Sequence, residues 1–165
     1  MTVDLNKINT IGPNSPGSIY NRLYYIKDLV DLESWQVVLD IGACEGMEGV
    51  GFAETLTNAH VYSFEPAPAN VARCNANYEK IEPAVRARVH LMQAALSNET
   101  KPIKFMAIDE ERAKTRGAVN YGMGSILEII NPDVLPWHHS VQMEVEAQAY
   151  TCLLYTSDAA DDTPC

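Results

Sequence analysis

Two glycines and one glutamate stand at spacings that suit the binding of a cofactor containing a nucleoside. Gly42 and Gly46 follow the short apolar run VVLDI, and Glu65 follows a second run, HVYSF, about 20 positions further on. Glycine lets the backbone turn sharply and approach a ligand without a Cβ in the way. An acidic residue at that distance hydrogen-bonds a ribose diol in nucleotide-binding folds. Each signal alone is common in α/β proteins, but their combination in this order predicts a nucleotide-cofactor site.

The residues between and after these glycines indicate which cofactor it is. A dinucleotide site has the pattern GxGxxG, with the pyrophosphate on a helix N-terminus. This loop reads GxxxGxxG and carries Glu45 and Glu48, whose negative charges repel a pyrophosphate. They tolerate a cofactor that has a sulfonium and an amine but no phosphate, which is S-adenosylmethionine. That the two glutamates only favour the helix dipole remains an open alternative.

Alternating elements are expected to position these residues. The pattern predicts an amphipathic helix over 19–32, strands over 37–43, 60–66 and 88–96, and helices over 46–58 and 68–81. This alternation is typical of an α/β sheet with parallel strands and right-handed crossovers, in which ligands bind beyond the carboxyl ends of the strands. Further extended segments are expected over 101–108, 124–130 and 142–150.

Length, composition and charge exclude several classes of function. A chain of 165 residues with 47% hydrophobic residues suits one domain with its own core. No stretch approaches the roughly 20 apolar residues of a membrane span, and the N-terminus does not resemble a secretion signal, so we expect a cytoplasmic protein without a membrane partner. Twelve basic against 22 acidic residues give a net charge of -10, which disfavours nucleic acid as a partner.

Metal and disulfide sites are not expected. The four cysteines, at positions 44, 74, 152 and 165, show no CxxC spacing, so the pattern supports neither a zinc site nor a disulfide framework. His138 and His139 are adjacent in the chain and have no carboxylate partner at ligand spacing. We therefore expect no metal.

Four segments carry a resemblance to a known family. DIGACEG, FEPAPANVARCNANYE, VHLMQAALSNETKPIKFMA and GMGSIL occur in the order and spacing of the FkbM-type methyltransferases, a branch of the class I S-adenosylmethionine-dependent fold. The resemblance covers about residues 37–151. It implies a Rossmann-like class I methyltransferase sheet that is incomplete: an N-terminal portion with the first three parallel strands plus extended segments.

The resemblance also implies roles for individual residues. In that family the glycine loop cradles the methionine part of the cofactor, the acid of the FEP motif holds the ribose hydroxyls, and residues after the third strand border the adenine. Cys44 stands where the family usually has Asn, which puts the role of that side chain in doubt. The implied cofactor-binding residues are Asp40, Gly42, Ala43, Cys44, Gly46, Glu65, Gln93, Ala94 and Ala95.

The implied activity is methyl transfer to a hydroxyl of a small-molecule acceptor such as a saccharide. The family's later acidic strand, with a motif like KIDVEGAE, has no counterpart here, so the catalytic residues are unknown and we expect this fragment to be inactive. Residues 1–18 are expected to be an irregular lead-in and 19–151 a partial methyltransferase domain. The run CLLYTSDAAD within 152–165 resembles a translated transposase adapter, which predicts a non-native tail.

Two alternatives stay open at the level of sequence. One is an oxidoreductase with a Rossmann fold that binds NAD, which the missing GxG and the acidic loop disfavour. The other is a non-catalytic Rossmann-like binding module. Cys44 and the missing acidic strand favour this second alternative.

Overall fold

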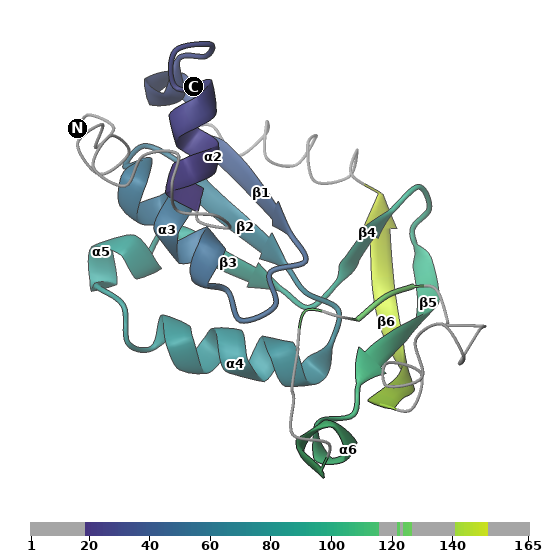
Figure 1. The fold of residues 1–165 in the computed structure, drawn as a ribbon. Helices are drawn as coiled ribbons and strands as arrows, with labels where there is room; N and C mark the ends of the chain where they lie inside the picture. Colours follow the sequence, from purple (N-terminus) through teal and green to yellow (C-terminus); the bar gives the residue numbers. More distant parts are fainter. Residues whose placement is uncertain (1–18, 116–121, 123, 127–140, 152–165) are drawn as a thin grey trace.

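The strands form two separate sheets that meet after the third strand (Figure 1). The computed structural model describes residues 19–115, 122, 124–126 and 141–151. Within these residues, the first sheet has the order β1-β2-β3 and the second the order β4-β6-β5. The bounds are β1 Val37–Ile41, β2 His60–Phe64, β3 Val89–Met92, β4 Ala95–Ser97, β5 Lys101–Ile108 and β6 Gln142–Thr151.

The first sheet is parallel throughout. Asp40 pairs with Ser63 across β1 and β2, and Ser63 pairs with Leu91 across β2 and β3. Helices α3 (Met47–Thr55) and α4 (Pro68–Tyr78) connect the strands. The predicted α/β fold is confirmed, and the sheet corresponds to the part of a Rossmann-like sheet that the sequence predicted. Its parallel strands end at one common edge, which brings the loops after β1 and β2 together.

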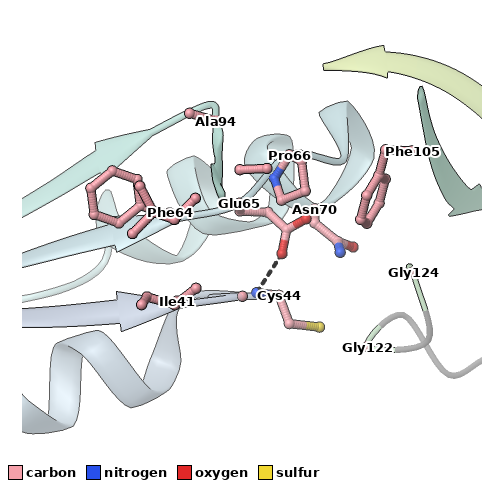
Figure 2. Close-up of a pocket in the computed structure, with 13 residues that line it drawn as sticks. Ile41, Cys44, Phe64, Glu65, Pro66, Asn70, Ala94, Phe105, Gly122 and Gly124 are labelled. Atoms are coloured by element: carbon pink, nitrogen blue, oxygen red, sulfur yellow. Dashed lines mark hydrogen bonds between the residues drawn. The ribbon is translucent and has the colours of Figure 1, made fainter. Parts of the chain in front are cut away.

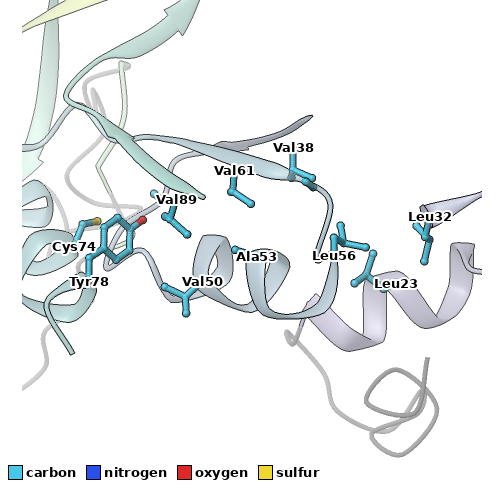
Figure 3. Close-up of a cluster of buried hydrophobic side chains, with 12 residues drawn as sticks. Leu23, Leu32, Val38, Val50, Ala53, Leu56, Val61, Cys74, Tyr78 and Val89 are labelled. Carbon is cyan, nitrogen blue, oxygen red and sulfur yellow. The ribbon is translucent and has the colours of Figure 1, made fainter. Parts of the chain in front are cut away.

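One face of this sheet packs against helices to form the main core (Figure 3). Val38, Val61 and Val89 point from the strands toward α3, and Tyr78 of α4 lies beside Val89. Full burial of an aliphatic side chain of this size contributes about 1.5–3 kcal/mol. Successive side chains of a strand point to opposite faces, so the neighbours of Val38 on β1 turn away from this core.

The first helix is shorter than the sequence predicted. α2 (Ile19–Ile26) ends well before residue 32, and a short 3₁₀ helix, η2 (Leu32–Ser34), follows. The Asp31 side chain accepts a hydrogen bond from the N–H of Glu33 at 3.1 Å. A carboxylate that caps a new turn competes with continuation of the preceding helix. The prediction of one helix over 19–32 was therefore wrong.

The strand predicted over 88–96 is in fact two strands in different sheets. β3 ends at Met92, the N–H of Ala94 bonds back to Met92 O at 2.9 Å, and β4 begins at Ala95. Between α4 and β3 the chain forms one short helix, α5 (Pro83–Arg86). The bend at residues 92–95 places small side chains where the two sheets meet.

The second sheet confirms the extended segments predicted over 101–108 and 142–150. β6 pairs parallel with β4 and antiparallel with β5. α6 (Glu110–Thr115) follows β5, and Glu110 forms an ion pair of 2.6 Å with Arg73 of α4, which links the second sheet to the helical layer of the first. Of the segment predicted over 124–130, only 124–126 is described.

Three expectations depend partly or wholly on residues that the structure does not describe. The expected lead-in at 1–18 and the expected tail at 152–165 both lie outside the described residues. Within the described part of the chain, no helix reaches the length and apolar character that crossing a membrane requires.

Candidate functional site

A cavity of about 200 Å³ lies between the two sheets, at the carboxyl ends of β1 and β2 (Figure 2). Its walls come from the loop after β1, the segment after β2, the bend after β3, and the second sheet. The predicted site residues that the structure brings together in its wall are Gly42, Cys44, Glu65, Ala94 and Ala95.

The loop after β1 has left-handed backbone at every second residue. Gly42, Cys44 and Gly46 have φ values of 84°, 54° and 80°. Gly42 tolerates this conformation because it has no Cβ, whereas Cys44 does not gain that freedom. Asn adopts positive φ far more readily than most residues. The backbone conformation at position 44 therefore favours Asn over the Cys that stands there.

Hydrogen bonds tie this loop to the end of β2. The N–H groups of Gly42 and Ala43 both donate to the carbonyl of Phe64, at 2.9 and 3.0 Å. The N–H of Gly46 donates within the loop to Ala43 O at 2.7 Å. These amides are therefore already committed to acceptors within the protein.

Glu65 is the carboxylate that faces the cavity. Its side chain is only 4% exposed, and both oxygens accept backbone hydrogen bonds: Oε2 from Cys44 N–H at 2.8 Å and Oε1 from Ala67 N–H at 2.9 Å. Hydrogen bonds to an ionised group are stronger than neutral ones, so the carboxylate is held in one orientation. Each oxygen has further acceptor capacity, which lets Glu65 receive hydroxyl donors from a ligand.

Asp40 lies beneath the helix and does not line the cavity. Ser63 Oγ donates to Asp40 Oδ2 at 3.1 Å, and burial raises the pKa of the Asp40 carboxyl. A Cβ added to Gly49 of α3 would lie 2.5 Å from Ser63 Oγ and 3.0 Å from Asp40 Oδ2. The Asp40 side chain therefore packs between β1 and α3. Any effect of Asp40 on a bound ligand is transmitted through the loop after β1.

The other three predicted residues also lie outside the cavity wall. Ala43 is buried in the main core, and Gln93 is exposed at the bend after β3. Gly46 lies over Tyr78: a Cβ at this position would come within 2.6–2.8 Å of the tyrosine ring and hydroxyl. Its role is to let the loop approach α4 closely.

Sequence reasoning missed several residues of the wall, among them Asn70, Phe105 and Gly124. Asn70 is a buried amide near the start of α4, and Phe105 comes from the second sheet. A Cβ on Gly124 would lie 2.6 Å from the Phe105 ring. The GMGSIL motif signalled this glycine, but nothing local in the sequence connects it with Phe105.

The surroundings of the two described cysteines disfavour their thiolate forms. Burial, and then the charge of Glu65, raise the pKa of Cys44, and burial raises that of Cys74 to about 12. The Cys74 thiol donates to Cys44 O at 3.3 Å. Because the thiolate is the nucleophilic form, neither cysteine suits nucleophilic catalysis.

The acidic residues of the glycine loop do not face the ligand space. Glu45 is exposed, and Glu48 forms a bidentate pair with Arg22 of α2, at 2.8 and 3.1 Å. Neither glutamate lines the cavity. The sequence predicted that their charges repel a pyrophosphate, but in the structure neither charge contacts the ligand space. Among the described residues no cluster of three or more His, Cys, Asp or Glu could hold a metal. His138 and His139 lie outside the described residues.

Comparisons with known proteins give distant structural likenesses. No protein-family model matches the chain, and no curated protein matches it in sequence. Among solved structures, it is similar to the methyltransferase FkbM from Methylobacillus flagellatus KT, with 17% identity over 48% of this chain and a TM-score of 0.41. It is also similar to the glycopeptide N-methyltransferase MtfA complexed with sinefungin, with 10% identity over 85% of this chain and 73% of that one, and a TM-score of 0.34. The first match spans 22% of the FkbM chain.

Proposed function

We propose that this chain binds S-adenosylmethionine in the cavity between its sheets, as part of a methyltransferase that modifies a hydroxyl of a small molecule such as a saccharide. The observation that carries the proposal is the buried carboxylate of Glu65, which the N–H groups of Cys44 and Ala67 hold in place at the edge of the parallel sheet. That is the position of the acid that binds a ribose diol in nucleotide-binding folds.

The loop amides support a cofactor without phosphate. A pyrophosphate in a glycine-rich loop is bound by free backbone N–H groups, but in the loop before α3 the N–H groups of Gly42, Ala43, Cys44 and Gly46 all donate to acceptors within the protein. An anion at this loop would also face the Glu65 carboxylate. A zwitterionic amino-acid group carries no net charge, and its ammonium is attracted by the same negative charge.

The size and lining of the cavity suit part of such a ligand. About 200 Å³ is less than the roughly 300–1,000 Å³ of pockets for drug-sized molecules, so the described walls enclose a portion such as the nucleoside. A Cβ built on Gly42 meets no atom within 4 Å. The backbone there faces open space and leaves room for the ligand to approach.

When bound, S-adenosylmethionine supplies an electrophilic methyl group. The described residues hold and orient the ligand. Glu65 accepts hydrogen bonds from ligand hydroxyls, and the N–H of Cys44 in the loop after β1 fixes the position of the Glu65 carboxylate. Glu65 is the only acidic residue among the described cavity-lining residues, and its two backbone bonds commit it to this holding role. We assign no described residue as the general base that removes the proton from the acceptor hydroxyl.

Calorimetric titration of the 165-residue chain tests the proposal. We expect saturable binding of S-adenosylmethionine and S-adenosylhomocysteine and none of NAD. Glu65→Ala is expected to weaken S-adenosylhomocysteine binding about tenfold or more, because a hydrogen bond to a charged group is lost. Glu146→Ala, at an exposed position of β6, is the matched control and is expected to bind as the wild type does.

The outcomes separate the rival functions. Binding of NAD without S-adenosylhomocysteine would overturn the proposal in favour of an oxidoreductase. Binding of S-adenosylmethionine without transfer of a labelled methyl group to any hydroxyl acceptor of a saccharide panel would favour a non-catalytic binding module. Circular dichroism of Glu65→Ala checks that lost affinity does not reflect lost folding.

A further inference from the structure

We propose that Phe105 is the aromatic wall that contacts the base of the cofactor, so that the second sheet determines specificity for a nucleoside. This inference rests on the proposed function and deepens it. Glu65 comes from the end of β2 in the first sheet, whereas Phe105 comes from β5 in the second, and both line one cavity. The site is complete only where the two sheets meet.

The Phe105 ring is fixed in place by a buried cluster of small apolar side chains. It is 8% exposed and packs in a cluster with Ala67 and Ala107, against which Val145 and Ala147 also pack. Ala67 is also the residue whose N–H bonds to Glu65 at 2.9 Å. The position of the ring and the position of the carboxylate are therefore coupled through one backbone segment, which fixes the distance between them.

A glycine segment packs against the same ring. Met106 and Ser125 form an antiparallel bridge, with hydrogen bonds of 2.7 and 3.0 Å between their backbones. The bridge brings Gly124 so close that a Cβ there would lie 2.6 Å from Phe105 Cζ and 2.8 Å from Cε1. The ring thus lines the cavity together with Gly122 and Gly124.

The order of residues along the cavity indicates that the base lies beside Phe105. In Figure 2, Glu65 lies between Phe64 on one side and Phe105 on the other, with Cys44 of the glycine loop below it. With a ribose on Glu65 and the amino-acid part at the glycine loop, the remaining part of the ligand extends toward the second sheet. An aromatic ring in the wall there suits a planar base, because contact with an aromatic side chain is favourable for any purine.

The test compares two ligands of which only one carries a base. S-adenosylhomocysteine carries adenine, and S-ribosylhomocysteine has the same amino-acid part on a ribose whose anomeric carbon bears a hydroxyl in place of adenine. We expect Phe105→Leu to weaken S-adenosylhomocysteine binding about tenfold and to leave S-ribosylhomocysteine binding unchanged. Phe105→Trp is expected to restore the preference for the ligand with adenine. Phe52→Leu replaces a partly buried phenylalanine that packs against the main core, away from the cavity, and serves as the matched control.

Each outcome has a distinct meaning. Equal losses for both ligands in Phe105→Leu would overturn the inference, because they would show a general disturbance of the site. Unchanged affinity for both would overturn it as well. If the wild type binds neither ligand, the proposed function itself fails, and the inference fails with it. A well-folded Phe105→Trp variant with restored preference cannot be explained by packing alone.

Discussion

The backbone N–H of Cys44 donates to Glu65 Oε2 at 2.8 Å, which ties the strained loop after β1 to the end of β2. Cys44 has a φ of 54°, so the loop keeps a costly conformation while it makes this bond. The second oxygen of Glu65 bonds to Ala67 N–H at 2.9 Å. One buried carboxylate therefore organises two backbone segments around the cavity.

Glu65→Gln is expected to destabilise the fold although it changes the shape little. Two N–H donors point at the two carboxylate oxygens, and an amide has only one oxygen to offer them. The NH₂ group then faces a buried N–H, which costs about 1–3 kcal/mol. Urea denaturation measures the loss, and Glu146→Gln at an exposed position is expected to stay within about 0.5 kcal/mol of the wild type. Equal stability of the two variants would contradict the arrangement.

Substitutions at Cys44 are expected to follow backbone preference. Cys44→Asn places a residue that favours the left-handed region at a φ of 54° and should raise the unfolding free energy by about 0.5–1 kcal/mol. Cys44→Val places a β-branched residue there and should lower it by about 1–3 kcal/mol. Thermal or chemical denaturation of both variants and the wild type checks the expected order of stability, with the asparagine variant highest and the valine variant lowest. A valine variant as stable as the asparagine variant would show that the loop relaxes.

Gly42 and Gly46 form a matched pair for separating strain from clash. Both have a left-handed φ, of 84° and 80°, so alanine costs about 1–2 kcal/mol at either position. At Gly46 the new Cβ also lies 2.6–2.8 Å from Tyr78, whereas at Gly42 nothing lies within 4 Å. We expect Gly46→Ala to lose at least about 1 kcal/mol more than Gly42→Ala in urea denaturation. Gly42→Ala should instead weaken ligand binding, and similar stabilities would contradict the Tyr78 contact.

Stability is expected to decrease in mild acid because of His90. Burial first, then His60 and Arg86, lower the pKa of His90 below its ordinary value of 6.5, and the His60 and His90 rings approach to 2.9 Å between nitrogens. The unfolded chain therefore takes up this proton at higher pH than the folded chain. The contribution of His90 to the unfolding free energy is complete above pH 6.5 and decreases as the pH falls toward its folded pKa.

Denaturation at a series of pH values measures this dependence, and His90→Gln provides the control. Between neutral pH and mild acid, the unfolding free energy of the variant should depend less steeply on pH than that of the wild type, since the glutamine side chain does not titrate. NMR titration of His90 gives the folded pKa directly. A value at or above 6.5 would contradict the expectation.

Local pattern was sufficient for the first sheet and for part of the site. The apolar runs before Asp40 and Glu65, and the glycines that follow the first run, predicted parallel strands with a ligand-facing edge, and β1, β2 and β3 confirm the strands. These features were predictable because side-chain period, glycine and strand ends are properties of neighbouring residues. The cofactor itself stays a proposal.

Only the tertiary structure decided which residues face the cavity. Asp40 and Ile41 are neighbours, yet the strand turns Asp40 under α3 and leaves Ile41 61% exposed at the cavity wall. The bend after Met92 and the contact between Phe105 and Gly124 join segments far apart in the chain. Such contacts depend on how two sheets pack together, and packing complementarity between distant segments is not encoded in any single stretch of sequence. The sequence alone therefore determined the parallel strands of the first sheet and the carboxylate that follows β2, while the tertiary structure decided the strand order and the packing of the second sheet decided the shape of the site.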